Sequence, residues 1–81
     1  MYIIGVYDIC TNEKKGQTRL VKIMKVFRKY LHHIQKSVFE GELSEAKFNS
    51  LMLEAKKIIN INEDYLIFYK IDNKKIAKES V

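Results

Sequence analysis

The chain has 81 residues, of which 47% are hydrophobic and 31% are charged, and its formal net charge is +5. This composition predicts one small globular domain over residues 1–81 and excludes a disordered chain. A single cysteine excludes an intrachain disulfide, and the absence of a signal-type segment or a membrane-length apolar run predicts a cytoplasmic protein without membrane contact.

The first half of the chain predicts a strand followed by a helix. Tyr2–Asp8 is β-branched and aromatic and stays apolar until it reaches a carboxylate, which predicts a central strand buried on both faces. Residues 11–16 are polar and include a glycine, so they predict a loop. The segment after them carries an apolar stripe with helical spacings of three and four, formed by Leu20, Ile23, Met24, Phe27, Tyr30 and Leu31.

The second half begins with an extended stretch over residues 33–43. Its apolar residues do not keep one strict alternation, so we expect a bend or tight hairpin near Lys36 and Ser37. Ser44 predicts the N-cap of a second helix. The apolar run Tyr65–Ile71 predicts another buried strand. Residues 72–81 predict a short basic tail. The stripe of the second helix is formed by Phe48, Leu51, Met52, Ala55, Ile58 and Ile59.

The order strand, helix, strand or hairpin, helix, strand predicts an α+β fold. An antiparallel sheet with two helices on one face satisfies this order, and the ferredoxin-like β-α-β-β-α-β sandwich is its common small form. Because a domain of this size has a thin core, we expect a partner subunit to add stability.

Asp8 is the most informative candidate for a functional residue. It ends an apolar strand and precedes a polar loop, so it is either a turn or capping residue or a ligand for a divalent cation such as Mg²⁺. One carboxylate makes a weak site, whereas a two-fold dimer that pairs two copies of Asp8 makes a better one. Tyr7 points to the opposite face, where core packing is its simplest role.

A basic stripe runs along the first predicted helix, formed by Arg19, Lys22, Lys25 and Lys29. Such a stripe is either an ordinary solvated helix face or a surface that follows a phosphate backbone. The overall charge suits a polyanionic partner as well, although lysine-rich composition alone gives the same charge in many small proteins.

The other reactive side chains give weaker signals. His32 and His33 adjoin a predicted strand, where one could act as an acid or base, but surface or packing roles are the simpler interpretation. Cys10 has no evident base near it in the sequence, which argues against a nucleophile. No phosphate-binding glycine loop and no CxxC or HExxH motif is present.

Two blocks of sequence resemble a known family. The first is Ile4-Gly5-Val6-Tyr7-Asp8-Ile9, which is followed by a polar loop and by Arg19-Leu20. The second is the run Ile34-Gln35-Lys36-Ser37-Val38-Phe39-Glu40-Gly41-Glu42-Leu43. Together they closely resemble the CRISPR-associated Cas-two family, which shows a "YDI" strand end and a "Q-x-SVFEG-x-L" strand. The resemblance spans almost the whole chain.

This resemblance implies a ferredoxin-like homodimer whose sheets face each other, with two Asp8 residues near the axis able to hold Mg²⁺ or Mn²⁺. It implies metal-dependent endonuclease activity on RNA or double-stranded DNA. It also implies a second role, as the subunit that bridges Cas-one integrase dimers during spacer acquisition and supports duplex DNA. By matching position, Tyr7, Asp8, Arg19 and Phe39 form the expected catalytic neighbourhood.

The chain departs from the family at three places. His33 stands where several relatives carry arginine, the loop between Asp8 and Arg19 is slightly longer, and residues 75–81 are a weak candidate for the last strand that pairs with the partner subunit. Two functions therefore remain open, a DNA-binding adaptation subunit and a metal-dependent phosphodiesterase. A toxin-type ribonuclease of related fold is a further alternative.

Overall fold

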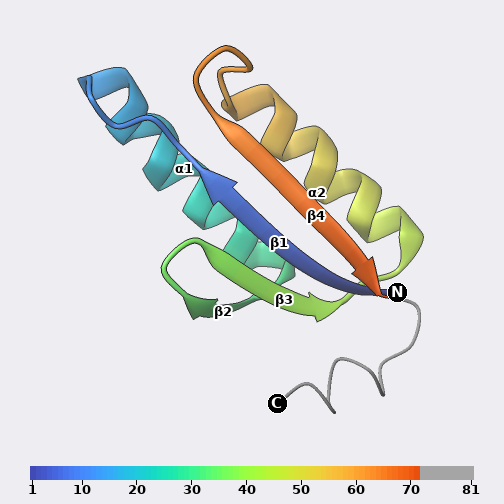
Figure 1. Cartoon of the computed structure of the whole chain (residues 1–81). Helices are drawn as coiled ribbons and strands as arrows, with labels where there is room; N and C mark the ends of the chain where they lie inside the picture. Colours follow the sequence, from blue (N-terminus) through green and yellow to red (C-terminus); the bar gives the residue numbers. More distant parts are fainter. Residues whose placement is uncertain (72–81) are drawn as a thin grey trace.

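The computed structural model describes residues 1–71, and the predicted tail at 72–81 lies outside these residues. Six elements follow one another along the chain (Figure 1): β1 (Tyr2–Asp8), α1 (Lys14–Tyr30), β2 (His32–Gln35), β3 (Val38–Glu42), α2 (Glu45–Ile58) and β4 (Tyr65–Ile71). Neither helix has the length and hydropathy needed to cross a bilayer within the described part of the chain.

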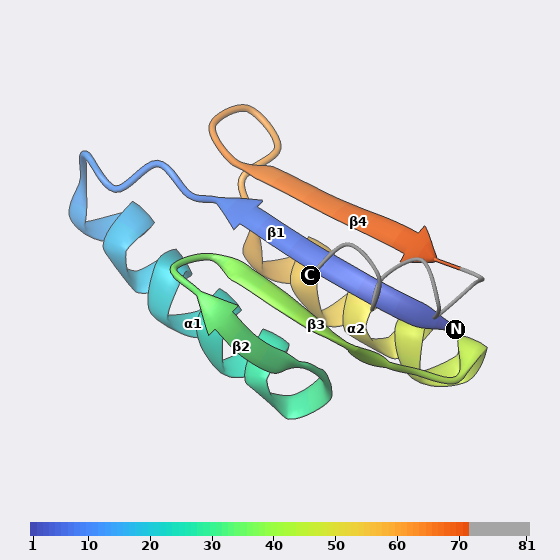
Figure 2. The same cartoon turned by 60° about the horizontal axis from the view of Figure 1, so that its bottom comes forward.

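The six elements form two layers. All strand pairs are antiparallel, and the strands lie in the order β2-β3-β1-β4. Both helices cover one face of this sheet (Figure 2), and none of the described helices lies on the other face. The predicted ferredoxin-like α+β fold is therefore confirmed.

The core lies between the sheet and the helices and is built around aromatic rings. Phe27 of α1 lies 5.1 Å from Tyr7 of β1 and 5.3 Å from Phe39 of β3, measured between ring centroids. Phe68 of β4 stacks on the same ring at 5.6 Å. Gly5 leaves the space for these rings, since a Cβ there would lie 2.8 Å from Phe27 Cε2.

Helix α1 begins earlier than the sequence predicts. Residues 14–16 were expected to belong to a loop because of their polarity and the glycine, yet they form the first turn of the helix. Gly16 is buried there, and a Cβ on it would lie only 1.8 Å from the carbonyl oxygen of Cys10. This glycine permits close contact between the helix and the end of the β1–α1 connection, and does not interrupt the helix.

The hairpin and the second helix agree with the sequence. Lys36 and Ser37 form the turn between β2 and β3, and Lys36 adopts φ of 40°, in the left-handed region. Ser44 caps α2, where its hydroxyl oxygen accepts a hydrogen bond from the Lys47 backbone N–H at 3.2 Å.

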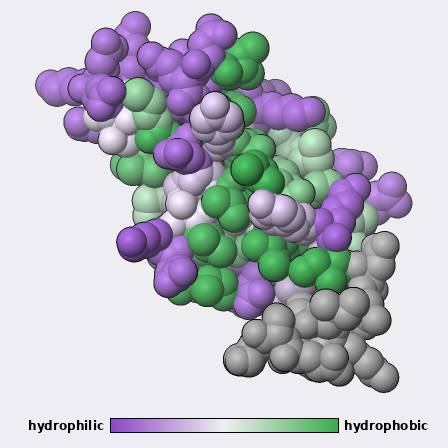
Figure 3. Space-filling view, in the orientation of Figure 1, coloured by the Kyte–Doolittle hydropathy of each residue, from purple (hydrophilic) through white to green (hydrophobic). Residues whose placement is uncertain are grey.

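The face of the sheet without helices is apolar and accessible, and we call it the open sheet face. β4 was expected to be buried, but its side chains alternate, and Tyr65, Ile67 and Tyr69 are 69%, 44% and 55% exposed. β1 was likewise expected to be buried on both faces, and only its helix-facing side is. Figure 3 shows apolar side chains gathered in the middle of this face. Its apolar and aromatic members include Tyr2, Ile4, Val6, Val38, Tyr65, Ile67, Tyr69 and Ile71.

Candidate functional site

Asp8 occupies the last position of β1, on the open sheet face. Alternation along β1 directs Tyr7 toward the helices and Asp8 to the opposite side, and Asp8 is exposed. Within the described part of the chain, no hydrogen bond or ion pair engages its carboxylate. Asp8 is therefore an accessible anion at the end of the central strand, not the cap of a turn.

Two segments flank Asp8 across the sheet. On one side Tyr65 of β4 lies directly opposite Asp8 in the antiparallel ladder. On the other side the Tyr7 backbone N–H donates to the Ser37 carbonyl at 3.3 Å, which places the β2–β3 turn beside the end of β1. This turn carries Lys36, which is exposed.

His33 supports this turn from β2. Its Nε2 lies 2.6 Å from the Lys36 carbonyl oxygen, and its ring stacks on Phe39 with centroids 4.6 Å apart. Although His33 is exposed, the contact engages one ring nitrogen with the backbone. The nearby His32 is exposed on the same strand.

Tyr7 and Phe39 belong to the core beneath the site. They are 3% and 0% exposed, and their ring centroids lie 5.8 Å apart. Burial raises the pKa of Tyr7, while the charge of Arg28 acts in the opposite direction. The two rings fix β1 against β3, and the catalytic roles that the resemblance assigns to them stay predictions.

Arg19 faces away from the open sheet face and binds the α2–β4 connection. Its Nε donates to Asp64 Oδ2 at 2.8 Å, and its Nη2 donates to Asp64 Oδ1 and to Glu63 Oε2, each at 3.2 Å. The structure thus brings Arg19 to two carboxylates and does not bring it to Asp8. Its assignment to the catalytic neighbourhood also stays a prediction.

Asp64 joins three segments through one buried carboxylate. Besides Arg19, it accepts hydrogen bonds from the backbone N–H groups of Cys10 at 3.0 Å and Asn60 at 2.8 Å. Burial of Asp64 acts to raise its pKa, but the hydrogen bonds from Arg19, Asn60 and Cys10 outweigh burial and hold the pKa below its ordinary value. The group stays ionised and anchors the connection that follows Asp8.

The basic stripe of α1 is divided by its acidic partners. Lys29 bonds to Glu54 of α2, which also accepts a hydrogen bond from Tyr30. The bonds from Lys29 and Tyr30 lower the pKa of Glu54. Since Arg19 and Lys29 are both paired with acids, Lys22 and Lys25 are the members of the stripe that have no acidic partner in the described structure.

The described residues of one protomer do not form a metal site alone. No cluster of three His, Cys, Asp or Glu side chains occurs among residues 1–71. The exposed carboxylate of Asp8 nevertheless has the hard oxygen chemistry that Mg²⁺ and Mn²⁺ prefer, and Mg²⁺ needs only one or two carboxylates when waters complete its shell. Two copies of Asp8 fit such an ion better than one.

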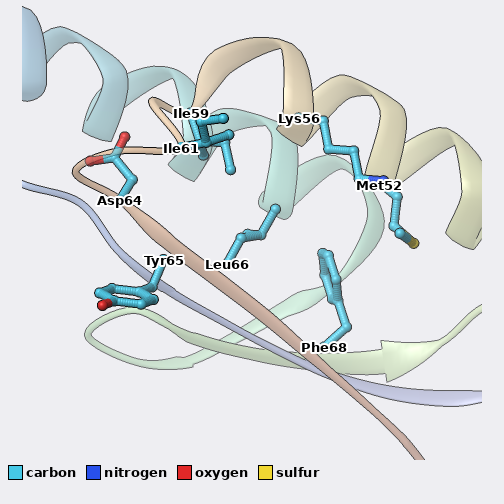
Figure 4. A pocket seen from close by; sticks show the side chains of 8 residues that line it. All are labelled: Met52, Lys56, Ile59, Ile61, Asp64, Tyr65, Leu66 and Phe68. Carbon is cyan, nitrogen blue, oxygen red and sulfur yellow. The ribbon is translucent and has the colours of Figure 1, made fainter.

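An apolar hollow of about 470 Å³ lies between α2 and β4 (Figure 4). Its walls come mainly from Met52, Ile59, Leu66 and Phe68. Asp64 lies at one end, but its carboxylate is already committed to Arg19. Lys56 and Tyr65 also border it, but most of its lining is apolar, so the hollow mainly offers packing surface.

Tyr65, Lys36 and Asp64 are neighbours of the site that sequence reasoning missed. Tyr65 was assigned to a buried strand, and only the register between β1 and β4 shows that it lies beside Asp8. Lys36 and Asp64 were treated as parts of connections. The "YDI" and "SVFEG" blocks indicate the surroundings of Asp8 but contain no information about β4.

Comparison with known proteins gives one consistent result. The family model "CRISPR associated protein Cas2" matches residues 1–79. A protein of Moorella thermoacetica named "CRISPR-associated endoribonuclease Cas2 2" is 46% identical over 95% of this chain and 86% of its own length. A "CRISPR-associated endoribonuclease Cas2" of Thermotoga maritima is 47% identical over 94% of this chain and 80% of its own length. The crystal structure of Streptococcus pyogenes Cas2 is similar with a TM-score of 0.86, at 28% identity, and the match covers 98% of this chain and 94% of that chain.

Proposed function

Because the chain belongs to the CRISPR-associated protein Cas2 family, we propose that it acts as a homodimeric, metal-dependent endoribonuclease whose two Asp8 residues share one site. The observation that carries this proposal is the carboxylate of Asp8, which is exposed at the end of an apolar sheet face and has no partner among residues 1–71. The names of the relatives support cleavage of RNA. The family match favours a CRISPR-associated role over the toxin-type ribonuclease considered from the sequence.

The open sheet face supports the homodimer. It gathers tyrosines and branched apolar side chains on adjacent strands, and monomeric proteins seldom leave such a surface in water. The end of the face far from Asp8 also contains polar groups. There the side chain of Tyr2 is hydrogen-bonded to Glu40, which is the main reason that the pKa of Tyr2 is raised to about 12. A second copy is the natural partner, because a two-fold axis applies the same apolar patch to itself.

The same axis supplies the second carboxylate. Two Asp8 side chains brought close together repel each other, and a divalent cation between them removes this repulsion. When bound there, Mg²⁺ or Mn²⁺ would supply charge stabilisation at the phosphate and lower the pKa of a bound water. The contribution of this chain is to hold both carboxylates on rigid strand ends, supported by the Tyr7 and Phe39 rings beneath.

Replacing Asp8 by asparagine tests this function. We expect Asp8→Asn to lower the rate of RNA cleavage by at least about 100-fold, because an amide oxygen without charge is a weak ligand for a hard cation. The dimer should persist, because Asp8 is not an apolar contact. The measurement is cleavage of a labelled single-stranded RNA with Mg²⁺, with Mn²⁺ and with EDTA, together with light scattering for the mass of the particle.

Glu40→Gln provides the matched control, since it removes an acidic charge from the open sheet face at a distance from Asp8. Cleavage that survives Asp8→Asn, or that continues in EDTA, would assign the activity to another site or to a contaminant. An equal loss of cleavage in both variants would show that the activity depends on the overall negative charge of this face and not on Asp8 itself.

A second role is favoured by the remaining basic surface of α1. Lys22 and Lys25 are exposed, lie three residues apart, and have no acidic partner in the described structure. We propose that this surface supports duplex DNA in an adaptation complex with a Cas-one integrase. The net charge of +5 is consistent with this role.

Charge reversal tests the duplex surface. In the double variant Lys22→Glu and Lys25→Glu, we expect weaker binding to duplex DNA and a salt dependence whose slope falls by about 2, one for each lysine that no longer neutralises a phosphate. The measurement is fluorescence anisotropy over a range of salt concentrations. Lys47→Glu with Lys57→Glu makes the same change of net charge on α2. If both double variants weaken binding equally, α1 does not provide a specific duplex surface.

A further inference from the structure

Tyr65 stands out because of its position beside Asp8. It lies directly opposite Asp8 in the ladder between β1 and β4, so the Cβ atoms of the two residues are about 5 Å apart. The alternation of β4 places both side chains on the open sheet face. Its ring is 69% exposed and points away from Leu66 and Phe68, which face the helices (Figure 4).

Tyr65 borders the hollow between α2 and β4, yet the described residues give its ring no specific partner. No ring contact or hydrogen bond engages the Tyr65 side chain in the described part of the chain, whereas the buried aromatics contact one another at 5.1 to 5.8 Å. Its backbone is nevertheless firmly held. The preceding residue, Asp64, is fixed by Arg19 and by two backbone N–H groups. The ring is thus presented on a rigid base.

We propose that Tyr65 is a stacking platform for an unpaired base of single-stranded RNA bound at Asp8. This inference rests on the proposed function and adds a residue that binds a base beside the shared Asp8 site. An aromatic side chain stacks on any base whose face is free, and such contacts tolerate every sequence. Bases within a duplex are already stacked on their neighbours. A site that binds a phosphate near Asp8 and stacks a base on Tyr65 therefore selects RNA that is unpaired where it binds.

The proposal is compatible with a dimer through the open sheet face. Two Asp8 carboxylates cannot be packed against each other without water or a cation, so the end of the face that contains them stays hydrated. Tyr65 belongs to this end. Ile67 and Tyr69 lie further along β4, toward the centre of the apolar patch, and are available to the partner copy.

The test compares three side chains at this position, in the Asp8→Asn background so that the RNA stays intact. Tyr65→Leu should weaken binding of a short labelled single-stranded RNA about tenfold. Tyr65→Phe should bind as tightly as the parent, because it keeps the ring. Affinity for the duplex of the same sequence should be unchanged by either substitution. Irradiation of a 5-iodouracil-substituted RNA should give a crosslink to Tyr65, identified by mass spectrometry.

Tyr69→Leu is the matched control, because it makes the same substitution on the same face, about 13 Å further along the strand. It should leave the ratio of single-strand to duplex affinity unchanged. The proposal is overturned if Tyr65→Leu binds single-stranded RNA like the parent, or if its weaker binding follows only from a weaker dimer seen by light scattering. If the wild-type protein neither binds nor cleaves RNA, the proposed function fails instead.

Discussion

Ile67→Glu is expected to turn the proposed dimer into monomers. Ile67 lies halfway along the edge strand β4, on the open sheet face opposite Val6 of β1, and is 44% exposed in the protomer. A two-fold interface contains each substituted position twice, so two carboxylates without partners would have to leave water together. We expect the dissociation constant to rise at least about 1,000-fold, which corresponds to about 4 kcal/mol. Analytical ultracentrifugation over a range of concentrations measures it.

If the proposed function holds, the same variant should lose RNA cleavage together with dimerisation, because each protomer supplies only one Asp8. Its fold should persist, since Ile67 does not pack against the helices. Leu53→Glu is the matched control: it makes the same change at an exposed position of α2, 62% accessible and away from the sheet. A dimer that survives Ile67→Glu would show that the protomers associate through another surface.

Asp64→Asn is expected to cost about 3 kcal/mol of folding free energy at neutral pH. The amide cannot compensate the charge of Arg19, and its NH₂ group would face N–H donors of Cys10 or Asn60. The segments that contain Cys10, Arg19 and Asn60 would all lose the carboxylate that accepts their hydrogen bonds. Urea denaturation followed by circular dichroism gives the change in the free energy of unfolding.

The penalty should depend on pH with a definite sign. The folded pKa of Asp64 is lowered, so the stability it provides is fully present above the unfolded pKa, near 3.8, and is lost as the pH falls through the folded pKa. The difference between wild type and Asp64→Asn should therefore shrink below about pH 4. Glu63→Gln, which removes an exposed partner of the same arginine, should change stability little at any pH. A penalty that is constant down to about pH 2 would contradict the assigned role.

Local patterns predict most of the fold. The helical stripes give both helices, the broken alternation gives the turn at Lys36 and Ser37, and Ser44 gives the start of α2. These features depend on residues within a few positions of each other. The predicted start of α1 was wrong because it depends on a contact in the folded structure. The glycine at position 16 is needed for the close approach of the Cys10 carbonyl and does not mark a loop.

Only some of the residues at the candidate site could be predicted from the sequence. The apolar run predicts that Asp8 ends a strand, whereas its place in a shared site, with Tyr7 and Phe39 nearby, comes only from the family resemblance. The exposure of β4 could not be predicted, because an apolar strand has the same pattern whether a helix or a second protein covers it. The partners of Arg19 were missed because Asp64 looked like one more polar residue of a connection.

The strand order determines when, during synthesis, the sheet and the proposed site can form. β1 is the first described element and β4 the last, yet they are neighbours in the sheet. During synthesis, Asp8 is made 57 residues before Tyr65, which pairs beside it in the sheet. Such non-local pairing is slow to form, and the unpaired edge of β1 is prone to bind other chains in the interval. Pairing of β1 with β4, protection of this edge from aggregation and assembly of the proposed site are therefore one event, which occurs only when β4 is available.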